Sequence, residues 1–63
     1  MSFSDVLLNF RAKHNLTQQG LSEILGVHMN MICKYETEKA RPTRVNQIKF
    51  ENKMKEYEVE KNV

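Results

Sequence analysis

The chain of 63 residues has one cysteine, one proline, two glycines and no tryptophan. Since Cys33 has no second cysteine to pair with, no disulfide can form within the chain, and a lone cysteine is typical of a reducing cytosol. No apolar run approaches the roughly 20 residues of a membrane span, and no signal-peptide pattern precedes the first expected helix. We therefore expect a soluble, cytoplasmic protein.

The small size and the scarcity of turn residues favour one all-α domain. No alternation of Val, Ile and Thr predicts a strand. A chain this short buries only about 60% of its unfolded surface, so its core is marginal unless something else stabilises it. With disulfides excluded, oligomerisation is the common remedy that remains.

Four helices are expected from the capping residues. Ser4 is a good N-cap for a helix over 4–13, and Asn15 tolerates the left-handed backbone that would end it. Thr17 can cap a second helix that ends at Leu25. A third helix opens at Val27 or His28 and reaches about residue 36. After the loop 37–43, a long last helix begins near residue 44; the domain is expected to span 1–58, with a frayed charged tail at 59–63.

Positive charge is concentrated in the middle of the sequence. Residues 1–33 carry two basic and two acidic side chains, whereas residues 34–49 have a surplus of three, with Lys34, Lys39, Arg41, Arg44 and Lys49 against Glu36 and Glu38. A local basic cluster suits a polyanion partner, although a solvated loop explains it equally well.

The stretch LTQQGLSEILGVHMNMICKYE, residues 16–36, contains two short helices separated at Gly26. A turn of about three residues with glycine lets such helices cross at a wide angle and share one apolar side. That side and the first helix supply the expected core: Leu7, Phe10, Leu21, Leu25, Val27, Ile32 and Tyr35. The outer face of the second of these helices keeps Met29, Asn30, Cys33, Lys34 and Thr37.

This pattern resembles the phage repressor and Cro-like (XRE-like, lambda-repressor-like) helix-turn-helix proteins over residues 7–43. The matching positions are Leu7, Arg11, Leu16-Thr17-Gln18, Leu21-Ser22, Leu25-Gly26-Val27, Ile32, Tyr35-Glu36, Lys39, Arg41 and Pro42. The chain departs from the family at Gly20, where a helix-favouring residue is usual, and at Glu38, where glycine or asparagine often ends the third helix. The usual fifth helix also has no obvious counterpart, so four helices, or five, are expected.

The resemblance implies a sequence-specific regulator of transcription, of phage or bacterial type, that binds double-stranded DNA at an operator. The residues that would read bases from the third helix, at about 28–36, are Met29, Asn30, Lys34 and Thr37. Those that would contact phosphate are Gln18, Gln19, His28, Lys39, Arg41 and Arg44. Each has a simpler reading: apolar packing for Met29, a polar first-turn residue for Gln18, and solvated loop charges for Lys39 and Arg41.

Arg11 and Glu36 are similar to an ion pair that joins the first and third helices in that family, although each could instead be solvated. No combination of nucleophile, base and orienting group indicates an enzyme. His14 and His28 lack metal-site spacing, and no cofactor or small-molecule ligand is expected. The alternative to a DNA-binding regulator is a protein-interaction module, such as an antirepressor or antitoxin, that retains the fold.

The last helix has two apolar stripes on roughly opposite sides. One contains Val45, Ile48 and Val59, and the other contains Phe50, Met54 and Tyr57. Because Val45 and Ile48 lie closest to Pro42, we expect the first stripe to face the domain's own core. Phe50, Met54 and Tyr57 are then predicted to form a homodimer interface, which would suit paired DNA half-sites. Alternatively, all six residues complete one core.

Overall fold

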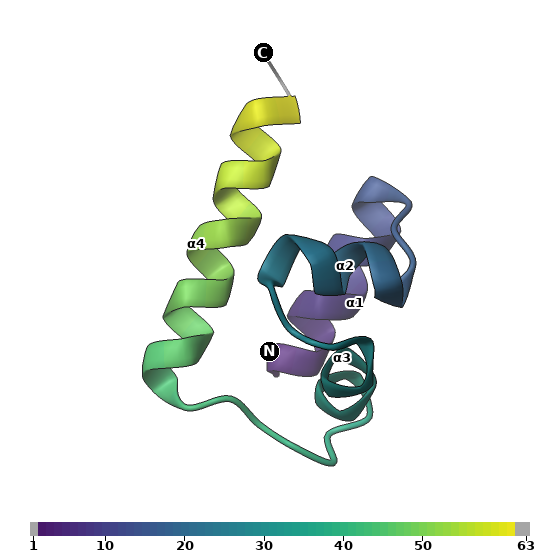
Figure 1. The fold of residues 1–63 in the computed structure, drawn as a ribbon, viewed down its shortest axis with the longest axis vertical. Coiled ribbons are helices and arrows are strands. Elements are labelled where there is room, and N and C mark those ends of the chain that lie inside the picture. Colours follow the sequence, from purple (N-terminus) through teal and green to yellow (C-terminus); the bar gives the residue numbers. More distant parts are fainter. Residues whose placement is uncertain (1, 62–63) are drawn as a thin grey trace.

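The computed structural model describes residues 2–61, which form four α-helices (Figure 1). They are α1 (Phe3–His14), α2 (Gln18–Leu25), α3 (Met29–Glu36) and α4 (Arg44–Lys61). No strand occurs among the described residues, so the prediction of an all-α chain is confirmed. In the described part, a single long helix follows the loop, and a fifth helix is not found.

The start of α1 differs from the prediction. The N-cap is Ser2 and not Ser4, because the Ser2 hydroxyl accepts the Asp5 backbone N–H at 3.3 Å, three residues further on. Ser4 is buried inside the first turn, with its hydroxyl 2.8 Å from that of Ser2. The end of α1 is as predicted, since Asn15 has a left-handed backbone with φ 56°.

The predicted boundaries of α2 and α3 are confirmed. The Thr17 hydroxyl accepts the Gly20 N–H at 3.0 Å, and Gly26, with φ 73°, ends α2. His28 caps α3 by accepting the Asn30 N–H on Nδ1 at 3.0 Å. In Figure 1, α3 is seen nearly along its axis while α2 lies across the picture, so the two short helices are strongly inclined to each other.

Glu38 takes the left-handed backbone that glycine or asparagine more often provides after a helix, with φ 62°. The turn is closed by backbone bonds from Glu38 N–H to the Tyr35 carbonyl at 3.3 Å and from Lys39 N–H to the Lys34 carbonyl at 2.9 Å. Glu38 thus replaces the glycine or asparagine of the family that the chain resembles, and the turn after α3 is still closed by backbone hydrogen bonds.

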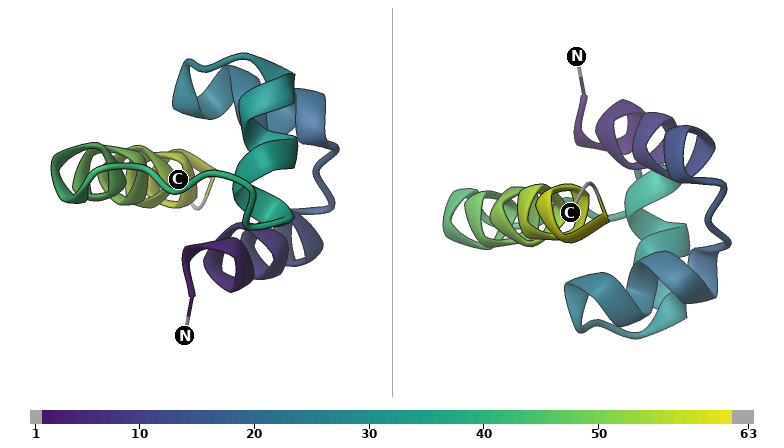
Figure 2. Two further views of the ribbon diagram at one scale, coloured as in Figure 1. Left: turned by 90° about the horizontal axis from the view of Figure 1, so that it is seen from below. Right: turned by 90° about the horizontal axis from the view of Figure 1, so that it is seen from above.

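The core lies where α1, α2 and α3 meet. Six of the predicted core residues are buried, namely Leu7, Phe10, Leu21, Leu25, Ile32 and Tyr35, and Val27 is half-buried against them. α4 packs onto this core from one side of the other three helices, as both views in Figure 2 show.

The assignment of the two stripes of α4 was wrong. Phe50 and Met54, predicted to face a partner, are buried in the chain's own core, and Tyr57 packs against that core. Contacts between aromatic rings explain why this stripe faces the core. The ring centroids of Phe50 and Phe3 are 6.2 Å apart, and those of Tyr57 and Phe10 are 5.8 Å apart. Phe, Met and Tyr bury more apolar surface than two valines and an isoleucine. Packing their side of α4 against the core is therefore more favourable.

The stripe expected to face the core is consequently exposed. Val45 is 62% exposed, Ile48 48% and Val59 65%. α4 also continues to Lys61, beyond the expected domain limit at 58, and residues 62–63 of the predicted tail lie outside the described residues. None of the described helices is both long and apolar enough to cross a membrane.

Candidate nucleic-acid interface

The outer face of α3 consists of side chains that point away from the core. Asn30, Cys33, Lys34 and Thr37 are exposed, and Met29 is 38% exposed. The opposite face of the same helix buries Ile32 and Tyr35. An eight-residue helix therefore has one side that packs inside the domain and one side that is open to solvent.

A buried carboxylate holds α3 in place. The Glu36 side chain is only 5% exposed, and both of its oxygens accept from Arg11 Nη1, at 2.8 and 3.1 Å. Arg11 Nε in turn donates to the Leu16 carbonyl at 3.1 Å. The predicted ion pair is thus confirmed, and it ties the end of α3 to α1.

Gln18 joins the same cluster. Its Nε2 donates to Glu36 Oε1 at 3.0 Å, which links the first turn of α2 to the end of α3. The prediction from sequence placed Gln18 at a phosphate and missed this bond, because nothing in a local pattern shows that residues 18 and 36 meet. Three helices therefore converge on one carboxylate, a favourable way to satisfy a charge taken out of water.

A depression runs along α2 and the turn after it to the start of α3. It has a volume of about 390 Å³ and is lined by Gln19, Ser22, Glu23, Gly26, Val27, His28 and Met29. Two predicted phosphate ligands, Gln19 and His28, lie on this rim and are exposed. Gln19 Nε2 donates to Glu23 Oε2 at 3.2 Å, so a phosphate would have to compete with that carboxylate.

The basic residues in the last turn of α3 and after it differ in whether they have an ion-pair partner. Lys34, Lys39 and Arg44 are exposed, and none of them makes an ion pair with any described residue. The loop that contains Lys39, and the first turn of α4, lie at the same end of the molecule as α3 (Figure 1). This end therefore presents positive charge beside the outer face of α3.

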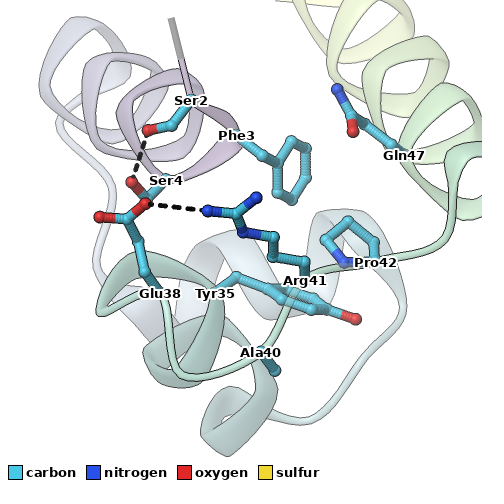
Figure 3. A pocket seen from close by; sticks show the side chains of 9 residues that line it. All are labelled: Ser2, Phe3, Ser4, Tyr35, Glu38, Ala40, Arg41, Pro42 and Gln47. Carbon is cyan, nitrogen blue, oxygen red and sulfur yellow. Dashed lines mark hydrogen bonds and ion pairs between the residues drawn. The ribbon is translucent and has the colours of Figure 1, made fainter.

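Arg41 is the exception. Its guanidinium is 3.9 Å from Glu38 Oε1 and extends toward the start of α1 (Figure 3). There it lines a cavity of about 220 Å³ together with Phe3 and Tyr35. Since its side chain is 81% exposed, this ion pair is weak, and Arg41 can exchange Glu38 for another anion at little cost.

Two further contacts were not predicted from the sequence. The Thr37 hydroxyl donates to the Cys33 carbonyl at 2.8 Å, so its polar group is turned back onto the end of α3. Lys53 Nζ, on α4, donates to the Leu25 carbonyl at 3.2 Å and caps the end of α2. The first joins residues four apart at the end of α3, whereas the second joins α4 to α2 and depends on the packed fold.

No known protein family, curated protein or solved structure matches this chain. Among the described residues, no three His, Cys, Asp or Glu side chains are grouped in a way that could hold a metal ion. Exposed polar and basic side chains lie together on the outer face of α3 and on the loop that follows it, at Asn30, Lys34, Lys39 and Arg41.

Proposed function

We propose that this chain is a sequence-specific regulator of transcription that binds double-stranded DNA through a lambda-repressor-like helix-turn-helix, with α3 in the major groove. The observation that carries the proposal is the outer face of α3, exposed along its length and backed by the buried Glu36 cluster. The major groove is about 12 Å wide and admits an α-helix. A helix that reads bases must also be held rigidly, and contacts to α1 and α2 serve that purpose here.

Each side chain on this face has a base that suits it. Asn30 can form a two-point hydrogen bond with adenine, Lys34 can donate to guanine, and Met29 can contact the methyl group of thymine. Thr37 has its hydroxyl bonded to the Cys33 carbonyl, which leaves its methyl group for the same kind of apolar contact.

Phosphate contacts would position α3 without reading sequence. Lys39 and Arg44 flank it after the loop, and His28 and Gln19 lie near its N-terminal end. Arg41 joins them once it leaves Glu38. Gln18 is reassigned in this proposal from a phosphate ligand to a support of Glu36, because its amide already donates there.

The experiment is selection of bound DNA from a random duplex pool, followed by affinity measurements on the selected site and on random duplex at several salt concentrations. Asn30→Ala should cost about 1–3 kcal/mol on the selected site and relax one base preference. Lys39→Ala should weaken binding to all duplexes similarly and reduce the salt slope by about one unit. Asn46→Ala and Lys13→Ala, on exposed parts of α4 and α1, are the matched controls.

The results separate the two roles. Equal losses on selected and random DNA for Asn30→Ala would refute base reading by α3. Absence of any salt-dependent affinity for duplex DNA would overturn the whole proposal and favour the protein-interaction module as the function of the fold.

A further inference from the structure

The outward face of α4 has apolar residues that are not buried in the core of the domain. Val45, Ile48 and Val59 are about half to two-thirds exposed. Asn52 and Lys55 lie between them on the same side of the helix, which gives the positions 45, 48, 52, 55 and 59. These steps of three and four residues repeat every seven, the spacing by which two helices pair along a common seam.

This face has no cover within the described chain. α4 meets the other three helices through the opposite side, where Phe50 and Met54 are buried. Figure 2 shows α4 on one side of α1–α3 in both views, with its far side turned away from them. The seam therefore lies on a surface that another molecule can approach.

Charges beside the seam point to a second copy as the occupant and determine its direction. In a parallel pair, Arg44 would face Lys49 and Glu51 would face Glu56, two repulsive contacts on each side of the two-fold axis. In an antiparallel pair, Lys49 faces Glu56 of the other copy twice, and Ile48 packs opposite Val59. A parallel pair would also place Lys55 against Lys55, whereas the antiparallel pair places it opposite Asn52.

The other flank of the antiparallel seam brings Glu51 near Glu58. Both carboxylates already have partners in their own chain. Glu51 accepts from Gln47 Nε2 at 3.2 Å, and Glu58 accepts from Lys13 Nζ at 2.8 Å and contacts His14 Nε2 at 3.0 Å. Their own partners offset the repulsion between them.

We propose that the outward face of α4 pairs antiparallel with α4 of a second copy of this chain. Because α3 and the first turns of α4 lie at the same end of the molecule (Figure 1), the two copies then carry α3 at opposite ends of the dimer. Such a dimer does not read two half-sites one turn apart on the same side of one duplex; it holds two separate segments. The pairing does not rest on DNA binding, since it is measured without DNA.

Sedimentation equilibrium from micromolar to near-millimolar protein tests the pairing. We expect a reversible monomer–dimer equilibrium for the natural chain, and loss of the dimer in Ile48→Glu. Leu8→Glu is the matched control, because Leu8 is 43% exposed on α1 and lies outside the seam. Circular dichroism shows that each variant is folded. A monomer at every concentration, or equal losses for both variants, would overturn the proposal.

Charge exchange tests the direction. In the antiparallel pair, Lys49→Glu and Glu56→Lys each replace two attractive contacts by two repulsive ones, so each should weaken association by about tenfold or more. The double variant restores opposite charges and should regain the natural affinity. A parallel pair would respond in the opposite way, because each single change would then join opposite charges, so stronger association of the single variants would overturn the antiparallel arrangement.

Discussion

The α1–α3 region and α4 differ in how their side chains are held. In α1–α3, the side chains of Leu7, Leu21, Leu25 and Ile32 are fully buried, and a carboxylate inside the domain is shared by three helices. α4 meets this region through Phe50, Met54 and Tyr57, and otherwise through single polar contacts such as Lys53 to the Leu25 carbonyl.

The difference shows where rigidity is concentrated. The exposed face of α3 is backed by the Glu36 cluster and the buried core, whereas one long side of α4 is largely exposed. The two helices thus differ in their internal contacts: α3 is held by side chains of α1 and α2, whereas α4 is exposed along one side. Substitutions in the two regions should have correspondingly different effects.

The largest effect is expected at the ring that attaches α4. Phe50→Ala should destabilise the fold by about 3–5 kcal/mol, because it removes a buried ring and leaves a cavity. Ile48→Ala, two residues earlier on the outward side, should change stability by less than about 0.5 kcal/mol at concentrations where the chain is monomeric. Urea unfolding of both variants measures the contrast, and similar losses would show that both sides of α4 are packed.

The next effect is expected at Glu36. Glu36→Ala leaves Arg11 without its partner, which should cost about 3 kcal/mol, the lower end for a buried pair because the Arg11 side chain is 26% exposed and can be partly hydrated. Exposed Glu23→Ala is the matched control and should be nearly neutral. A double-mutant cycle with Arg11→Ala measures the coupling directly, and zero coupling would remove Glu36 from its role in holding α3.

A gain in stability is expected at Gly20, in the first turn of α2. An added Cβ would lie 3.4 Å from Thr17 Oγ1 and 3.5 Å from Leu16 Cδ2, which is ordinary contact. Gly20→Ala should therefore stabilise the chain by about 0.5–1 kcal/mol through helix propensity. Gly26→Ala is the opposing control, because φ there is +73° and a Cβ would lie 3.2 Å from Lys53 Nζ. Thermal unfolding should move the two midpoints in opposite directions.

The smallest effect is expected at the exposed contact between α1 and α4. Hydrogen bonds first from Lys13 and then from His14 lower the pKa of Glu58 below its ordinary value of 4.5. A carboxylate with a lowered pKa contributes stability above its unfolded-state pKa and loses it as pH falls through the folded value. The stability difference between the natural chain and Glu58→Gln should therefore be present at neutral pH and shrink as the pH falls through the lowered pKa of Glu58. A difference independent of pH would show that the contact does not couple to protonation.

Most of α1–α3 was predictable from the sequence because its signals are local. Thr17, Gly26 and His28 mark helix ends through bonds to residues a few positions away, and Leu21, Leu25 and Ile32 repeat at helical spacing. The pairing of Arg11 with Glu36 came from the resemblance over 7–43. Its third member, Gln18, did not, because a glutamine in a first turn has no distinctive pattern.

The orientation of α4 was not predictable by the same means. Each stripe contains three apolar residues, and nearness in sequence to Pro42 favoured Val45 and Ile48. Which stripe faces the core depends on the direction that the loop 37–43 gives to α4. It also depends on the space beside Phe3 and Phe10, which only larger side chains fill. Both are properties of the assembled fold.

Glu38 also bears on how selection has acted on this chain. Its left-handed backbone would suit glycine better, and its carboxylate places negative charge on the basic end of the molecule and holds Arg41. A change to glycine would relieve the backbone and release Arg41 together, so stability and the DNA affinity proposed above would improve in the same step. Glu38 is thus unfavourable for stability and for that affinity. This is expected where selection keeps stability and affinity sufficient for function and does not maximise them. A single substitution at position 38 could therefore improve both properties.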